Sequence, residues 1–582
     1  MKISHIRYTP NLIVGTLLGV WWLLNLLLAT NVELANDEAY YWWWAKGCGL
    51  DWGYFDHPPA VALLIWLTAW IPSELGVRLA TSLLQPLYLY LLWRLWCSQA
   101  KDVGKTSALA FVAICFSIPL LQLYGLLALP DAPSLFCAVL FIWAVNQLWR
   151  SPSWVSASAV GLATALLGYS KYQGIIVVLT AAAVYLYASF KAKRRHAALY
   201  MLCWGAVALI FFAPHLFWLA QHDWAPLRYH LVTRSQSTYK VSFTAEYVLN
   251  FIAVFNPLLI WFIIKGYLLD RRATKADNTS LLPLLMRCVF VAYALFFLIA
   301  SFRGRTQPQW CLIAAVPAVW LLMRCHESTH DSKSNKVLRI FLACSVIVMM
   351  VARLLLLFNP FGFKGEIWNN KENCEKVAMV ADGRPAVMLH NYTFPCKYRF
   401  YTGCEASSVP VYYERDSQWR YADADDGYKG RDVLVLVPNW TNGELLPLNG
   451  GKDLRYRELT NYLPLRRIRI ELLNGCLKGD SLVATMKVHN PYDYDICPTE
   501  TNNLIWLLSE KIATANVPSC AAPVECCLPA MSDTTICCTF PLGSMSEILY
   551  QHPVSLSIGA DAIMPSINST PTLLYKQKNT VK

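Results

Sequence analysis

The chain has 582 residues, of which 56% are hydrophobic and only 15% are charged, and its mean hydropathy is +0.35. Soluble globular proteins carry roughly 25% charged residues, so this composition excludes an ordinary soluble protein. The formal net charge of +12 does not indicate nucleic-acid binding, because many of the Lys and Arg residues fall in short clusters between apolar runs, as orientation signals in membrane proteins do.

The first 358 residues alternate between long apolar runs and short polar connections. A polytopic, mostly α-helical membrane bundle of about eleven spans is therefore predicted. The predicted spans lie near residues 11–30, 77–97, 106–126, 133–149, 153–170, 173–190, 197–219, 245–264, 288–302, 309–323 and 340–358. The first run lacks a clear small-residue cleavage site, which favours a retained span over a signal peptide.

One apolar segment, 60–71, has only 12 residues, and a segment that short is expected to lie on the membrane surface. With the N-terminus in the cytoplasm, the inner connections then hold 19 Lys and Arg residues, about twice as many as the outer side. This orientation predicts a first outer loop at 31–76 and an extracytoplasmic region after Phe358. The compact membrane part is typical of a bacterial inner-membrane protein, with the C-terminal region in the periplasm.

The apolar runs stop after Asn359, and short alternating stretches such as 432–440 and 466–473 replace them. We therefore expect a transmembrane domain (1–358), a mixed α/β domain (359–464) and a β-rich domain (465–582) that suggests a β-sandwich. Ten of the 19 cysteines lie in this tail, and an even number in an oxidising compartment permits disulfides. Cys396 with Cys404 is the local pair that we expect.

The predicted outer loops contain charged residues that orientation does not explain. Ionisable groups close to the membrane are costly, so they usually have partners or a function. Several cations with a few carboxylates on one face suit an anionic lipid head group, because Arg and Lys bind phosphate while a carboxylate handles a proton. The residues concerned are Asp37, Glu38, Asp56, His57, Asp131, Lys171, Arg228, Arg234, Arg303 and Arg305.

The first of these acids has two interpretations. Asp37 could cap the helix that DEAYYWWWA would form, since Asp is favoured at a helix start. Asp37, Tyr41 and Trp44 share one helix face, which could be an interfacial aromatic belt or a sugar-stacking surface.

The remaining candidates also have structural alternatives. Asp56 and His57, followed by two prolines, could form only a turn, or they could bind a divalent metal or a phosphate. Lys171 could be a snorkelling residue, and Arg303 and Arg305 could serve lipid head groups in general.

Taken in order, several motifs resemble one known family. They are DEAYY (37–41), WGYFDHPP (52–59), LGVRL (75–79), LALPDAPSL (127–135), SKYQG (170–174) and the series from Pro214 to Arg234. Together they resemble the dolichyl-phosphate-mannose-protein mannosyltransferase and aminoarabinose-transferase superfamily, over roughly residues 10–320. The resemblance implies the GT-C fold and the transfer of a sugar from a polyprenyl-phosphate donor to an acceptor on the outer face of the membrane.

The resemblance also implies roles for particular residues. The catalytic acid of the family corresponds to Asp37, with Glu38 beside it, and this chain has Asp56-His57 where aminoarabinose transferases carry Glu-Lys. A polyprenyl phosphate leaves as a stable anion, so one carboxylate acting as a base suffices and inversion is expected. Further expected roles are phosphate binding by His57, Lys171, Arg228, Arg234, Arg303 and Arg305, substrate binding by Tyr41, Tyr54 and Asp131, and metal binding by Asp56.

Two other functions compete with this interpretation. A transporter or flippase of a lipid-linked saccharide would use the same cations for phosphate, but transporters tend to have internal repeats and midplane ionisable groups, and the sequence indicates neither. A structural membrane anchor would need no outer set of carboxylates and arginines. The acceptor, whether protein, lipid A or glycan, and the sugar stay open, and a divalent metal is the one cofactor that the residues suggest.

Overall fold

The computed structural model describes most of the chain and divides it into two compact units, Met1–Phe363 and Lys364–Lys582. The described residues are 3–100, 103–231, 239–276, 281–328, 333–389, 391–409, 411, 417–422, 425–437, 442–450, 453–499, 503–510, 519–546, 553–560 and 568–569.

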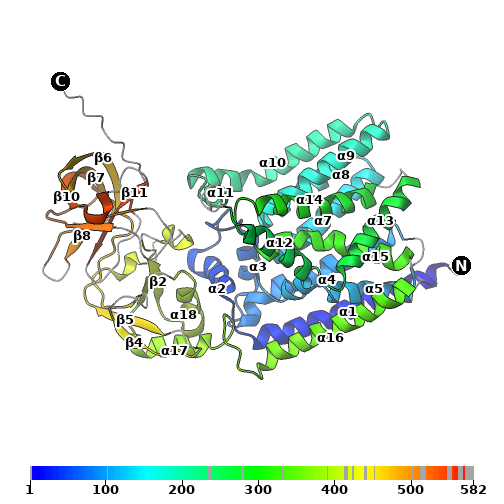
Figure 1. Cartoon of the computed structure of the whole chain (residues 1–582), viewed down its shortest axis with the longest axis horizontal. Coiled ribbons are helices and arrows are strands. Elements are labelled where there is room, and N and C mark those ends of the chain that lie inside the picture. Colours follow the sequence, from blue (N-terminus) through cyan, green and yellow to red (C-terminus); the bar gives the residue numbers. More distant parts are fainter. Residues whose placement is uncertain are drawn as a thin grey trace. The chain divides into compact units, whose positions relative to one another are not determined.

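The first unit is helical (Figure 1). Eight of its helices, within the described residues, are long and apolar enough to cross a membrane, and three shorter apolar helices accompany them. The helices are α1 (Ile3–Asn31), α2 (Asn36–Trp43), α3 (Ala60–Thr68), α4 (Glu74–Cys97), α5 (Lys105–Phe116), α6 (Pro119–Leu123), α7 (Asp131–Arg150), α8 (Trp154–Ser170), α9 (Ile175–Lys191), α10 (Ala197–Gln221), α11 (Ala225–Leu231), α12 (Val241–Val254), α13 (Ile260–Ala276), α14 (Leu281–Ala300), α15 (Ala315–Ser328) and α16 (Lys333–Phe358).

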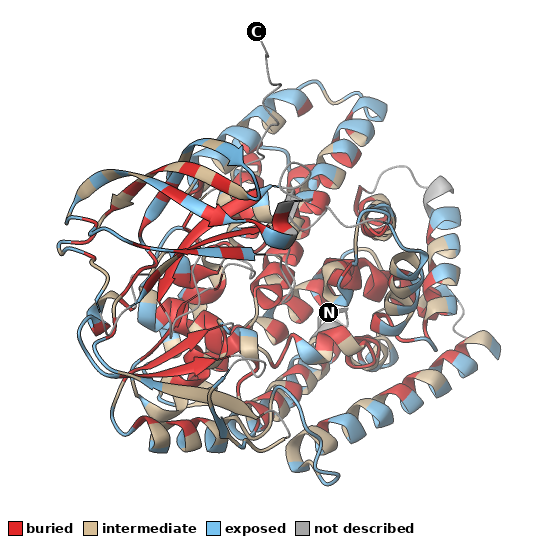
Figure 2. Ribbon diagram, turned by 60° about the vertical axis from the view of Figure 1, so that its left-hand side comes forward, coloured by how far each residue is buried: buried red, intermediate tan, exposed pale blue. Residues whose placement is uncertain are grey.

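Burial separates the inner helices of this unit from the outer ones. Most residues of α7 are buried, whereas few residues of α10 and α16 are. Figure 2 colours the chain by burial. The exposed side chains of α10 and α16 are largely apolar, as expected for helices that face lipid. The short segment after Pro59 forms α3, of only nine residues, so it is too short to span, as predicted.

Two predicted runs are interrupted. The run 245–264 is split between α12 and α13, where Asn256 has a φ of 70° and is followed by a proline. The run 106–126 is split where α5 ends and Pro119 starts α6. The two breaks meet, because Asn256 Nδ2 donates to the Ser117 carbonyl at 2.9 Å and also to Ser345 Oγ at 2.8 Å.

The second unit begins with a mixed sheet of order β2-β1-β3-β5-β4, in which β1 runs parallel to β2 and β3. The central strand β3 is buried throughout, as the apolar run after Asp432 predicts. The elements are α17 (Asn370–Ala381), β1 (Ala386–Leu389), α18 (Phe394–Thr402), β2 (Ala406–Val409), β3 (Val433–Val437), β4 (Glu444–Leu446) and β5 (Leu454–Leu459).

Two three-stranded antiparallel sheets follow, of order β10-β7-β6 and β11-β8-β9, and side chains from both share one hydrophobic core. Along β7, every second residue is buried, as the alternation in the sequence predicts. The strands are β6 (Arg469–Lys478), β7 (Ser481–Asn490), β8 (Leu504–Glu510), β9 (Ser519–Pro523), β10 (Ser532–Pro541) and β11 (Val554–Ala560).

The predicted disulfide between Cys396 and Cys404 is wrong, because neither cysteine forms a disulfide. Cys396 lies in the first turn of α18 and its Sγ is bonded to the Tyr392 carbonyl, whereas Cys404 follows the left-handed Gly403 beyond the end of that helix. In the described part of the chain, the one disulfide joins Cys497 to Cys527.

Candidate active site

The start of α2 is fixed by Glu38, whose side chain is fully buried. Its carboxylate accepts two hydrogen bonds from Arg78, of 2.7 and 2.6 Å, and one from the backbone N–H of Ala35 at 3.0 Å. A fourth donor, the N–H of Ala128, comes from the loop before α7 at 2.9 Å. Both oxygens of Glu38 are therefore engaged, and the residue ties three segments together.

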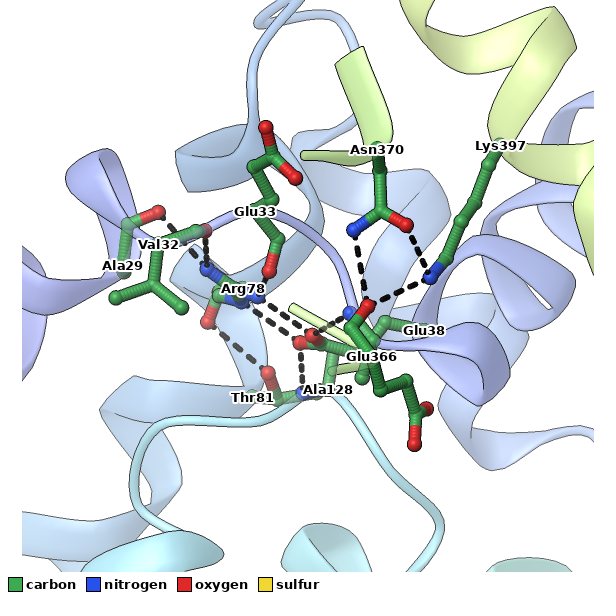
Figure 3. A network of polar contacts seen from close by, with 11 residues as sticks. Ala29, Val32, Glu33, Glu38, Arg78, Thr81, Ala128, Glu366, Asn370 and Lys397 are labelled. Atoms are coloured by element: carbon green, nitrogen blue, oxygen red, sulfur yellow. Dashed lines mark hydrogen bonds and ion pairs between the residues drawn. The ribbon is translucent and has the colours of Figure 1, made fainter. Parts of the chain in front are cut away.

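The partner of Glu38 has no exposed side-chain surface either. The guanidinium of Arg78 also donates to the carbonyls of Ala29, Val32 and Glu33, at 3.2, 2.6 and 2.9 Å (Figure 3). It thereby binds one carbonyl in the last turn of α1 and two in the segment that follows the helix. No role was predicted for Arg78 from the sequence, although an arginine within an apolar run indicates a buried partner.

Asp37 differs from its neighbour, because it lies on the exposed side of the first turn of α2. The charges of Asp131 and Asp37 both act on the buried Tyr124, so the starts of α2 and α7 lie close together. Asp131, at the start of α7, accepts a hydrogen bond of 2.6 Å from Lys171 Nζ, and both side chains are nearly buried.

Aromatic residues of the first loop pack closely between α2 and α3. The ring of Tyr54 stacks on Trp44 at 4.5 Å, and Tyr41 contacts both Trp44 and His57 edge-on. Burial raises the pKa of Tyr54, whose hydroxyl donates to the Gly49 carbonyl at 2.8 Å. The rings of Tyr41 and Tyr54 are thus used mainly in packing, which favours a supporting role over direct substrate contact.

Asp56 accepts a hydrogen bond of 3.0 Å from the Tyr40 hydroxyl and is buried. Among the described residues, no group of three or more His, Cys, Asp or Glu side chains is placed to bind a metal ion.

Helix α10 contacts the first loop through two side chains. His215 Nδ1 donates to the Trp52 carbonyl at 2.6 Å, so Nε2 accepts from the Tyr172 hydroxyl at 3.0 Å. Trp218 donates to Asp51 at 2.8 Å and covers Gly53, where a Cβ would lie 2.5 Å from the indole ring. The contacts between α10 and the first loop were not predicted from the sequence, since they join residues more than 160 positions apart.

A cavity of about 730 Å³ opens beside these residues. Its walls are formed by apolar side chains of α8, α9, α10 and α14, and its charged or ionisable lining residues are His57, Lys171, Arg303 and Arg305. Three predicted cations therefore meet at one cavity, together with His57.

One of these three cations, Arg305, is largely exposed and also pairs with Glu246 at 2.6 Å. Arg228 lies on the exposed side of α11 and is not part of the cavity lining, although its neighbour Leu227 is. Arg234 lies outside the described residues.

Known proteins resemble the chain in family and in fold. Residues 56–218 match the family model of dolichyl-phosphate-mannose-protein mannosyltransferase. Two crystal structures of ArnT from Cupriavidus metallidurans, in the apo state and bound to undecaprenyl phosphate, superpose with TM-scores of 0.54 and 0.53 at 12% and 11% identity. The matches cover 77% and 76% of this chain and 98% and 97% of ArnT. The chain has the GT-C fold. No curated protein sequence matches it.

The structural match confirms the predicted fold class. The family model, over residues 56–218, bears out the predicted resemblance and supports the predicted enzyme class, that of a membrane glycosyltransferase.

Proposed function

We propose that the chain transfers a sugar from a polyprenyl-phosphate donor to a hydroxyl or amine acceptor, with inversion at the anomeric carbon. The cavity carries this proposal, because it joins apolar walls to a cluster of Lys171, Arg303 and Arg305. Apolar walls suit an isoprenoid chain, and the cations suit its phosphate. Undecaprenyl phosphate is the ligand of one ArnT structure of the same fold, which supports the same donor class here.

Asp37 is the proposed general base. Its neighbour Glu38 already accepts four hydrogen bonds and neutralises Arg78, so a second role as proton acceptor would break a buried ion pair. Asp37 is exposed and stands at the N-terminus of α2, where a carboxylate is favoured. In this proposal Glu38 positions α2, and Asp37 takes the acceptor proton while the phosphate leaves as an anion held by the cations.

The remaining assignments follow from this donor class. Lys171, Arg303 and Arg305, with His57 at the edge of the cavity, are proposed phosphate ligands, and Asp131 is proposed to orient Lys171. We place the reaction on the outer face of a bacterial inner membrane, with the N-terminus in the cytoplasm and the second unit in the periplasm. Protein, lipid A and glycan are the acceptor classes to be tested.

The first experiment tests the base. Asp37→Asn, reconstituted with a synthetic polyprenyl-phosphate sugar, is expected to bind the donor normally and to lose transfer by a factor of 10² or more, in the range of a general base. Transfer at the native rate would refute the role of Asp37. Movement of the lipid-linked saccharide across the bilayer without any transfer would favour the transporter instead.

A second experiment tests the apolar wall. Ala208→Trp places an indole in the cavity, whereas Ala206→Trp places the same ring on the exposed side of α10. The first variant should raise the KM of a long-chain donor at least tenfold and change that of a short-chain donor much less. Equal effects of both variants would show that the chain binds elsewhere. Arg305→Ala should weaken donor binding, and if donor affinity and turnover are both unchanged, Arg305 is not a ligand.

A further inference from the structure

A second cavity, of about 480 Å³, lies between α4 and α7 at the end opposite the candidate active site. Both helices begin at the site, where Arg78 binds Glu38 and Asp131 binds Lys171. The second cavity is lined by their last turns, so it lies roughly 25 Å further along the helix axes, at a rise of about 1.5 Å per residue. Nothing in the proposed transfer reaction uses it.

The charge of this cavity is uncompensated among the described residues. Arg94 and Arg150 both line it, and no acidic residue is among its described lining. Neither arginine forms an ion pair within the described part of the chain. Two exposed arginines that line one cavity favour an anion.

A buried amide also lines the cavity. Asn146 is only 2% exposed, and its side chain makes no hydrogen bond to any residue that the structure describes. Because Asn146 lines the cavity, its amide can donate and accept hydrogen bonds there. A ligand oxygen in the cavity would satisfy Asn146, and Tyr90 and Gln147 add further polar groups to the same lining.

The orientation of the protein in the membrane explains the two arginines, but it does not explain the cavity or the buried Asn146. Arg94 and Arg150 occupy the last turns of their helices, where cations complement the helix dipole and mark the cytoplasmic end of a span. Orienting arginines need neither a cavity between them nor a buried amide at its wall.

An apolar track leads away from the cavity. Leu87 and Leu91 belong to its lining, and Leu83 and Leu87 are exposed, so leucines at intervals of four residues follow one face of α4. A small soluble anion would not use this track, whereas an acyl chain attached to a phosphate would. The track favours a lipid.

We propose that this cavity binds the head group of an anionic phospholipid from the leaflet that meets this end of the bundle. Arg94 and Arg150 bind the phosphodiester, Asn146 binds a head-group oxygen, and one acyl chain lies along Leu91, Leu87 and Leu83. The inference is independent of the donor and of the transfer reaction.

Native mass spectrometry of the full chain, purified from mixed vesicles of phosphatidylglycerol and phosphatidylcholine, tests the proposal. We expect the native protein to retain phosphatidylglycerol in preference to phosphatidylcholine. In the Arg94→Gln/Arg150→Gln variant, the ratio of the two retained lipids should fall at least tenfold. The control, Lys193→Gln/Arg195→Gln, removes two exposed charges from the α9–α10 connection and should keep it. Equal losses in both variants would overturn the site in favour of general electrostatic attraction.

Two further arms make the result specific. Asn146→Leu keeps both arginines but removes the amide, and it should reduce retention several-fold, which also covers the case in which the double variant fails to fold. The thermal midpoint of the native protein should rise with phosphatidylglycerol and not with inorganic phosphate. An equal rise with phosphate alone would overturn the lipid in favour of a soluble anion.

Discussion

Lys171 and Asp131 form a nearly buried ion pair, with 2.6 Å between Nζ and Oδ1, at the edge of the candidate donor cavity. Each residue belongs to a different motif, and the two stand 40 positions apart. Asp131 offsets the charge of Lys171, as Glu246 offsets that of Arg305. The ion pair with Asp131 holds the Lys171 side chain in place, so a donor phosphate would bind to a lysine that is already positioned.

A double-mutant cycle separates two roles of Lys171, the proposed binding of phosphate and the ion pair with Asp131. Lys171→Met leaves Asp131 buried without its cation and should cost about 3–5 kcal/mol of stability. Lys171→Met/Asp131→Asn should restore most of that stability, since no unpaired charge remains. Donor affinity should stay at least tenfold weaker in the double variant if Lys171 binds phosphate. Recovery of affinity together with stability would reduce Lys171 to a structural partner.

The Arg78–Glu38 pair predicts a contrast between adjacent acids. Glu38→Gln should lower the free energy of unfolding by about 3–5 kcal/mol, because it leaves the fully buried Arg78 without a carboxylate. Asp37→Asn, at an exposed position, should change stability little. Thermal unfolding of both variants in the same detergent measures this contrast. A midpoint as low for Asp37→Asn as for Glu38→Gln would contradict it.

The disulfide of the second unit should stabilise it. Cys497 and Cys527 are 30 residues apart, and closing a loop of that length typically contributes about 2–4 kcal/mol. Replacing both by Ala should make the second unit more sensitive to protease at moderate temperature. Cys476→Ala, which removes an exposed free thiol, is the matched control and should leave the cleavage rate unchanged.

A surface cluster on β7 and β10 predicts a pH dependence. Lys487 and His489 both bind the Asp533 carboxylate at 2.9 Å, and these bonds lower the pKa of Asp533 below its ordinary value of 3.8. The cluster therefore stabilises the fold above about pH 4, the ordinary range of this carboxylate, and the contribution is lost as the pH falls through the lower folded pKa. Asp533→Asn should be slightly less stable at pH 7 and equal to the native chain near pH 2. Asp480→Asn, at an exposed position in the β6–β7 turn, is the control. Its stability relative to the native chain should not change between pH 7 and pH 2.

Much of the membrane fold follows from run lengths. Apolar runs predicted the spanning helices, and the 12-residue length of 60–71 predicted a helix that does not span. The breaks within two runs were missed, although Asn256 before a proline and Pro119 are local signals that could have indicated them.

The candidate site was only partly predictable. The predicted topology placed His57, Lys171, Arg303 and Arg305 together in the outer loops, and the structure brings them to one cavity. The sequence could not separate Asp37 from Glu38, because only the folded chain shows which of the two acids meets Arg78. It could not assign packing roles to Tyr41 and Tyr54 either, since those depend on rings contributed by other turns of the same loop.

The hydrogen bond from Asn256 to the Ser117 carbonyl has a consequence for how this bundle can change over evolution. The break between α12 and α13 supplies the donor, Asn256 Nδ2, and the break between α5 and α6 supplies the acceptor, the Ser117 carbonyl. A mutation that turned α12 and α13 into one continuous helix would leave the Ser117 carbonyl without this hydrogen bond inside the membrane. The two kinks should therefore be inherited or lost together.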